Sequence, residues 1–156
     1  MRDIIKLATE KGICKPWRED MAKATMKDFC EMFFKGSDWA MENDFPSLGL
    51  LRKYKTTFLY GLYTDAKVKK ENAKQIGFFG ESESELEYNE YNIGEIYIRH
   101  KSHVKITAKD NSIVYVTIAD GVTVEIEAEE NAKVTVFQYG GTVKGNAIIH
   151  QRSWEK

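Results

Sequence analysis

Val104–Ser112 reads "VKITAKDNS", and twenty residues further on Val124–Ala132 reads "VEIEAEENA". Val, Ile, Ala and Asn return at the same places of both stretches, whereas the polar residues between them change. Apolar and polar residues alternate in each stretch, which is the period of a β-strand with one buried face. A repeat of this kind predicts a stack of similar small structural units.

The alternation begins at about Thr56 and fits a ten-residue unit that starts at Tyr63. The fourth and sixth places of the unit are mostly apolar, so we expect their side chains to form the interior. The fourth place holds Ala66, Ile76, Leu86, Ile96, Ile106, Val116, Ile126, Val136 and Asn146, and the sixth holds Val68, Phe78, Tyr88, Ile98, Ala108, Ile118, Ala128, Gln138 and Ile148. The ninth place includes Asn111, Gly121, Asn131 and Gly141, residue types that tolerate left-handed backbone at a turn.

A period of ten fits an antiparallel meander or sandwich with one strand per repeat, or a solenoid with several strands per coil. The matches are stronger at a shift of twenty residues. At that shift Ala108 aligns with Ala128, and Lys105 aligns with the oppositely charged Glu125. Such a coil would stack like residues inside and opposite charges outside on strands ~4.8 Å apart. We therefore predict an α+β chain in which residues 56–156 form a short parallel β-solenoid of four to five coils, with about twenty residues and two strands per coil. The antiparallel meander or sandwich is the alternative.

Residues 1–55 have helical patterns and predict three or four short helices. Gly12 ends the first, Pro16 opens the second, and Thr25 with Asp28 forms a capping box for the third, which Gly36 ends. We expect this region to cap the first coil, because a bare terminal coil has unpaired backbone N–H and C=O groups. Its aromatic residues suited to that role are Trp17, Phe29, Phe33, Phe34 and Trp39.

The C-terminal end of the predicted solenoid is less well protected. Lys144 and Asn146 fall at inward places, so the burial pattern ends there, and Trp154 alone could close that end only in part. We expect an open end that favours self-association into a homo-oligomer.

The composition narrows the range of partners. The chain has 156 residues and a formal net charge of −1, without the basic excess typical of nucleic-acid-binding proteins. It has no apolar segment long enough for a signal peptide core or a membrane span, so we expect a cytoplasmic protein that binds neither nucleic acid nor membrane. Cys14 and Cys30 are expected to be reduced, structural thiols.

Two further stretches carry a resemblance. The run "IYIRHKSHVKITAKDNSIVYV", joined to the N-terminal "GICKPWREDMAKATMKDFCEMFFKGSDWAMENDFPS", resembles small proteins of gut Bacteroidales genomes and of their phages and mobile elements. The similarity spans most of the chain. It implies a mobile-element context, and no activity or site residue comes with it.

Catalytic chemistry has little support in the sequence. Parallel β-helices include acyltransferases and polysaccharide lyases, but the former use six-residue repeats and the latter generally need a longer solenoid. A small hydrolase or lyase built on His100, His103 and nearby carboxylates is a minor alternative. Glu90, Asp110, Glu130 and His150 would line one corner of the coils, where a calcium site is conceivable, but water-facing turn residues are the favoured interpretation. We predict a non-enzyme without a cofactor or metal.

Two groups of residues are candidates for binding. Tyr97, Tyr115, Phe137 and Tyr139 should point outward and serve as apolar anchors, and Glu83, Glu85 and Glu87 should form an acidic strip that steers a partner. The leading hypothesis is a protein-binding or assembly module, either a structural part of a phage or mobile element or an inhibitor of a host protein. The alternative is a carbohydrate-binding or other ligand-binding protein that uses the same aromatic face.

Overall fold

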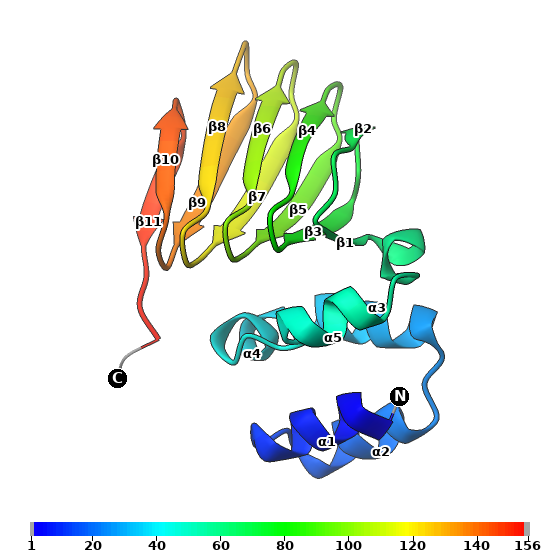
Figure 1. Ribbon diagram of the computed structural model, residues 1–156. Coiled ribbons are helices and arrows are strands. Elements are labelled where there is room, and N and C mark those ends of the chain that lie inside the picture. The colour runs from blue at the N-terminus through cyan, green and yellow to red at the C-terminus, as the bar shows by residue number, and fades with distance from the viewer. Residues whose placement is uncertain (1, 155–156) are drawn as a thin grey trace. The chain divides into compact units, whose positions relative to one another are not determined.

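The computed structural model describes residues 2–154, and the chain divides into two compact units, one up to Gly61 and the other from Leu62 onward. The first unit is helical and the second consists of β-strands (Figure 1). No helix within residues 2–154 combines the length and the apolar character that crossing a membrane requires.

The helical unit contains one more α-helix than the upper number predicted. Gly12 adopts left-handed backbone after the first helix, Pro16 lies in the first turn of the second, and Thr25 and Asp28 form both bonds of a capping box. The additional helix is capped by Ser47, whose hydroxyl accepts a hydrogen bond from the Leu50 N–H. The helices are α1 (Arg2–Glu10), α2 (Lys15–Ala22), α3 (Met26–Lys35), α4 (Ser37–Glu42) and α5 (Leu48–Lys53), followed by the 3-10 helix η1 (Thr57–Tyr60).

A polar cluster fastens the start of the helical unit to its later part. The Asp3 carboxylate of α1 accepts hydrogen bonds from Lys53 Nζ, at 2.6 Å, and from the Tyr54 hydroxyl. The Lys53 bond, together with the bond from Tyr54, lowers the pKa of the Asp3 carboxyl well below its usual value. The first helix is thereby held against the end of α5.

The second unit is a parallel β-solenoid of about four coils. Consecutive strands lie in different sheets, and every pair of neighbouring strands is parallel, which excludes the antiparallel meander. Sheet A has the order β1 (Leu62–Thr64), β3 (Gln75–Phe79), β5 (Ile93–Ile98), β7 (Ile113–Ile118), β9 (Lys133–Gln138), β11 (Ile148–Gln151). Sheet B has the order β2 (Lys69–Glu71), β4 (Glu83–Tyr88), β6 (His103–Ala108), β8 (Thr123–Ala128), β10 (Thr142–Gly145).

The central coils have the predicted period of twenty residues. Val104 pairs with Val124, Ile106 with Ile126 and Ala108 with Ala128. The end coils do not keep this period: Leu62 pairs with Gly77, fifteen residues on, and Ile148 pairs with Thr135, thirteen residues back. The repeat is therefore regular only where a coil has a full neighbour on both sides.

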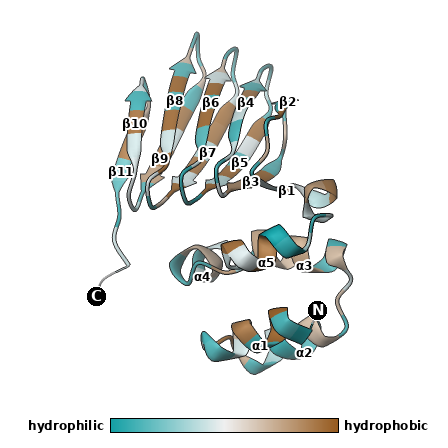
Figure 2. Cartoon of the chain, in the orientation of Figure 1, coloured by the Kyte–Doolittle hydropathy of each residue, from teal (hydrophilic) through white to brown (hydrophobic). Residues whose placement is uncertain are grey.

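The interior lies between the two sheets and includes more places than the two predicted. The fourth-place residues from Ile76 to Val136 are buried, and Asn146 and Ile148 are exposed, as expected where the pattern ends. The second place is also inward, with Val104, Val114, Val124 and Val134 buried. Figure 2 shows the resulting alternation of hydrophobic and hydrophilic residues along the strands.

The turns differ from the prediction by one residue. Glu90, His100, Asp110, Asp120 and Glu130, in the eighth place, adopt positive φ, whereas Asn111, Gly121 and Asn131 do not. Hydrogen bonds between coils fix this choice, since Asp110 Oδ2 accepts from the Glu90 N–H at 2.8 Å and Asp120 Oδ2 from the His100 N–H at 3.1 Å. Among the four ninth-place residues predicted to adopt left-handed backbone, Gly141 alone does so, and its φ is 85°.

Candidate functional site

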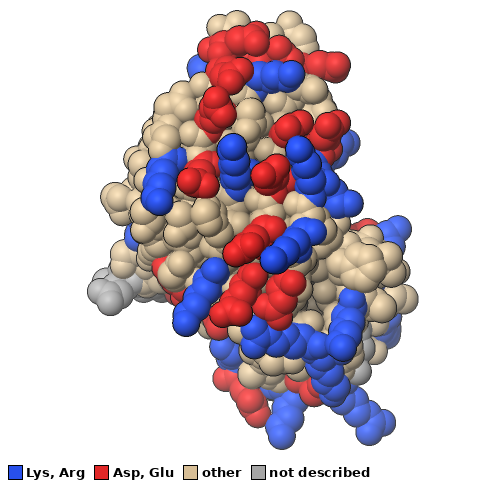
Figure 3. Space-filling model, turned by 45° about the horizontal axis from the view of Figure 1, so that its top comes forward, with Lys and Arg blue, Asp and Glu red and all other residues tan. Residues whose placement is uncertain are grey.

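One outward row of sheet B is a ladder of alternating charge. Strand register places Lys69, Glu85, Lys105, Glu125 and Lys144 in one outward row across the five strands. Neighbouring strands are about 4.8 Å apart, so each charge has an opposite charge beside it. In the view of Figure 3, acidic and basic side chains are interleaved in the middle of the picture, whereas acidic ones gather at its top and basic ones at its bottom.

The acidic strip predicted at Glu83, Glu85 and Glu87 lies on β4, within this charged face. Lys67 Nζ lies 3.7 Å from a Glu83 carboxylate oxygen, and Lys69 Nζ lies 3.6 Å from one of Glu85. His103 of β6 lies beside Glu83 in the strand register. The distance from its Nε2 to Glu125 Oε2 is 2.8 Å, and this hydrogen bond lowers the pKa of the Glu125 carboxyl. Glu83 and Glu85 are thus balanced by basic groups of the same protein, whereas Glu87 lies beside Glu71 of β2 in the strand register.

The outer face of sheet A has a different chemistry. Tyr97, Thr117 and Phe137 share one outward row, and Glu95, Tyr115, Thr135 and Ile148 share the next. Ile93 is 54% exposed, Tyr115 43% and Ile148 51%. We call the set Ile93, Tyr97, Tyr115, Phe137 and Ile148 the apolar face.

Three of the four predicted anchors lie on the apolar face, and two of these have contacts within the protein. The Tyr97 hydroxyl lies 3.3 Å from Glu95 Oε2, and the Phe137 ring is stacked on His150 with centroids 5.7 Å apart. Tyr97 and Phe137 are half-buried, so Tyr115 is the most accessible of the three.

Tyr139 lies outside the apolar face, beyond the end of β9. Its ring is stacked on Trp154 with centroids 3.9 Å apart, and the Arg99 guanidinium lies over the same indole. Arg99 is 6% exposed and forms an ion pair with Asp120 at 3.0 Å. This cluster attaches the C-terminal segment to the solenoid and occupies the ring of Tyr139.

The predicted anchors and the acidic strip therefore do not form one patch. Tyr97, Tyr115 and Phe137 are on sheet A, whereas Glu83 and Glu85 are on sheet B. A single flat partner cannot contact both outer faces at once. The sequence pattern showed which residues point outward, but assigned both groups to one interaction.

A hollow borders the apolar face near the start of β5. Tyr91, Ile93, Gln75 and Glu95 are among the residues that line it, and its volume is about 460 Å³. Tyr91 is 81% exposed and extends the apolar surface beyond the strand. The surface around Ile93 is therefore indented, and polar side chains border its two apolar ones, Tyr91 and Ile93.

The turn residues considered for calcium have other roles. Glu90, Asp110 and Glu130 are left-handed turn residues, and Asp110 bonds to backbone, whereas His150 lies on β11 against Phe137. Within residues 2–154 there is no group of three or more His, Cys, Asp or Glu side chains that could hold a metal ion.

The histidines considered for catalysis are also engaged in structural contacts. His100 Nδ1 accepts a hydrogen bond from the Gly80 N–H at 3.0 Å, which stacks one turn on the next. His103 pairs with Glu125, as described above. Neither His100 nor His103 lines the hollow beside Ile93, the cavity of the helical unit described below, or the shallow pocket beside Lys144.

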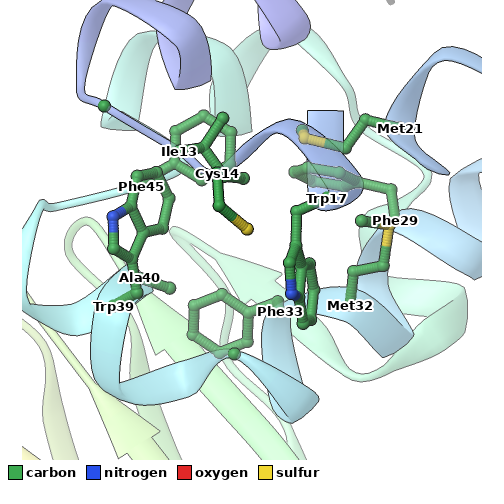
Figure 4. A pocket seen from close by; sticks show the side chains of 12 residues that line it. Ile13, Cys14, Trp17, Met21, Phe29, Met32, Phe33, Trp39, Ala40 and Phe45 are labelled. Atoms are coloured by element: carbon green, nitrogen blue, oxygen red, sulfur yellow. The ribbon is translucent and has the colours of Figure 1, made fainter. Parts of the chain in front are cut away.

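A cavity in the helical unit was not predicted. Its volume is about 290 Å³, and it is lined almost entirely by apolar side chains, among them Trp17, Met32, Phe33, Trp39 and Phe45 (Figure 4). The sequence pattern predicted a cap for the solenoid from Trp17, Phe33 and Trp39. Their concentration in a short helical stretch was the available signal, but an apolar cluster gives no indication of a space at its centre.

No protein-family model, curated protein or solved structure matches the chain.

Proposed function

We propose that the protein is a non-enzymatic protein-binding module that docks a partner on the apolar face of sheet A. The observation that carries the proposal is the difference between the two outer faces of one solenoid. Sheet B presents a balanced row of charges, whereas sheet A exposes Ile93, Tyr115 and Ile148 on three different strands. Exposed apolar and aromatic side chains gathered on one face are typical of protein interfaces.

The rigidity of the solenoid supports this function. Each central strand is hydrogen-bonded to a parallel neighbour on both sides, so the outward side chains are held in fixed rows. A pre-ordered surface loses little conformational entropy when a partner binds. Glu83, Glu85 and Glu87 contribute to the electrostatic field of the protein in this proposal, and they make no direct contact at the apolar face.

The proposal includes self-association through the last coil. Ile149 pairs with the inward Val136 yet is 43% exposed, because no further strand follows β11 within residues 2–154. Unpaired strand edges with apolar side chains favour pairing with another chain.

A cytoplasmic location and a mobile-element origin complete the proposal. Cys14 and Cys30 are both free, which is usual in a reducing compartment. In the mobile-element setting that the sequence resemblance implies, a rigid binding face would serve either a structural part or an inhibitor of a host protein.

The test compares three proteins in affinity capture from cells of the source organism. The wild type and a control pair on sheet B, Glu85→Ser with Lys105→Ser, should retain the same partner. The double variant Ile93→Ser, Tyr115→Ser should recover at least tenfold less of this partner, because two exposed anchors are removed from the apolar face. Equal recovery by all three proteins would show that the partner contacts another surface.

A glycan array with the same proteins separates this proposal from carbohydrate binding. Aromatic rings can stack on sugars as well as on apolar protein groups. Sugar binding that depends on Tyr115 would replace protein binding as the function of the apolar face.

A further inference from the structure

The cavity of the helical unit is built from α2, α3, α4 and the segments that connect the helices. Phe33 and Phe45 form its deeper wall, with exposed fractions of 4% and 6%. Trp17, Met32 and Trp39 also line it but are only half-buried. Large apolar side chains that surround a space and remain partly accessible are typical of a small-molecule site.

The position of Trp17 depends on a glycine. A Cβ atom at Gly36 would lie 3.3 Å from Trp17 Cη2, so the indole rests directly on the backbone between α3 and α4. Figure 4 shows the Cys14 side chain directed into the space between Phe45 and Trp39 on one side and Trp17 on the other. The cavity thus has a thiol among otherwise hydrocarbon, aromatic and thioether groups.

The lining determines which ligands can bind. No side chain with a formal charge lines the cavity, so a buried ionic group would lose its hydration without an opposite charge. Five aromatic side chains offer ring edges and faces, and two methionines offer polarizable sulfurs. They are Trp17, Phe29, Phe33, Trp39 and Phe45, with Met21 and Met32. These groups favour an uncharged aromatic molecule.

The volume determines the size of that molecule. An apolar cavity of about 150 Å³ is large enough to hold benzene. The volume here is about 290 Å³, roughly twice as large. We propose that this cavity binds a small, uncharged aromatic molecule of about two fused rings, and that the Cys14 side chain contacts the bound ligand.

The two cysteines provide a direct test in the full-length chain. Cys14 is exposed, whereas Cys30 is fully buried, and burial raises the pKa of the Cys30 thiol to about 12. A maleimide should therefore modify Cys14 alone. The probe is 2-naphthol, which is uncharged at neutral pH. With 2-naphthol at about ten times its dissociation constant, the rate of Cys14 alkylation by N-ethylmaleimide should fall about tenfold.

A pair of substitutions at position 14 tests the location. Cys14 is the N-cap of α2 but its side chain makes no capping bond, so its replacement should leave the fold intact. Calorimetry should show that Cys14→Ser binds 2-naphthol like the wild type, and that Cys14→Phe, which fills the space, binds at least tenfold more weakly. Circular dichroism should show both variants folded.

Three results would overturn the proposal. The first is an alkylation rate that 2-naphthol does not change up to its solubility limit. The second is equal affinity of Cys14→Phe and Cys14→Ser. The third is binding of the 2-naphthoate anion as tight as that of 2-naphthol, because it would contradict the assignment of an uncharged ligand.

Discussion

At the scale of single residues, the side chain of Tyr88 fills the space that a side chain at position 94 would need. Tyr88 is 1% exposed, and its hydroxyl donates a hydrogen bond to the Ala73 carbonyl at 2.8 Å. A Cβ atom at Gly94 would lie 2.6 Å from Tyr88 Cζ. We expect Gly94→Ala to lower the free energy of unfolding by about 2 kcal/mol, because the ring cannot move without breaking its packing.

Urea unfolding followed by circular dichroism measures this effect. Gly121→Ala is the matched control, since φ is not positive there and the nearest atom to an added Cβ is 3.5 Å away. A change within about 0.5 kcal/mol is expected for that control. Similar losses for both substitutions would mean that glycine itself, and not the Tyr88 ring, is required.

The Asp3 cluster makes the helical unit sensitive to pH. Because its bonds to Lys53 and Tyr54 lower the folded-state pKa of Asp3, the ionised carboxylate stabilises the fold above the unfolded-state pKa of about 3.9. This contribution is lost as the pH falls through the lower, folded-state pKa. Asp3→Asn should therefore melt a few degrees below the wild type at neutral pH, and the difference should shrink in acid.

Thermal melting monitored by the helical circular dichroism signal tests the sign of this dependence. Glu10→Gln removes a carboxylate from the same helix, away from Lys53, and should not lower the melting temperature. A difference between Asp3→Asn and the wild type that grows in acid would contradict the assigned pKa shift.

The sequence could identify turn regions but not the particular left-handed residue. Asp, Asn and Gly all tolerate that backbone, and such residues occupy adjacent places, as in Asp110 and Asn111 or Asp120 and Gly121. Hydrogen bonds between coils determine which residue is left-handed, for example the bond that the Glu90 N–H donates to Asp110 Oδ2. Contacts of this type link residues twenty positions apart and are not visible in a local pattern.

At the scale of strands, the row Lys69, Glu85, Lys105, Glu125 and Lys144 places Lys105 between two carboxylates. Lys105→Glu would put three like charges side by side on β4, β6 and β8. Like charges directly opposite one another on neighbouring strands are destabilising. We expect the melting temperature of the solenoid to fall by a few degrees at low ionic strength.

Salt provides the check on this prediction. The loss should diminish as sodium chloride is raised to about 1 M, where the Debye length is about 3 Å. Lys101→Glu, which lies in a turn, changes the net charge equally and should have a smaller effect. A loss that is the same at every salt concentration would indicate a packing defect.

The strand register was predictable in the centre of the solenoid because the same side chains return every twenty residues. It was not predictable at the ends, where Leu62 pairs with Gly77 and Val143 with Val124. An end coil lacks one neighbour, so the stacking that enforces the period is absent on that side. The additional helix α5 was not predicted, and its six residues span less than two helical turns.

At the scale of the whole chain, the division into helices and solenoid was visible in the change of hydrophobic period. The cavity of the helical unit was not, because it arises where helices meet and the residues around it have the same apolar pattern as a filled core. The separation of the predicted binding residues onto two sheets also required the fold, since Glu85 and Tyr97 both point outward but from different strands.

The open C-terminal end yields a prediction about the assembly state. Ile148 and Ile149 are 51% and 43% exposed on β11, and sheet A has no strand beyond β11 within residues 2–154. Two copies that pair their β11 edges would bury Ile149, which pairs with the inward Val136, and satisfy the unpaired backbone groups of both strands. We expect size exclusion with light scattering to give twice the mass of one chain, and Ile149→Lys to give a single chain that remains folded. Ile93→Ser, on the apolar face, should leave the double mass unchanged. A single-chain mass for the wild type at all concentrations would refute self-association through this end, while leaving partner binding at the apolar face to its own test.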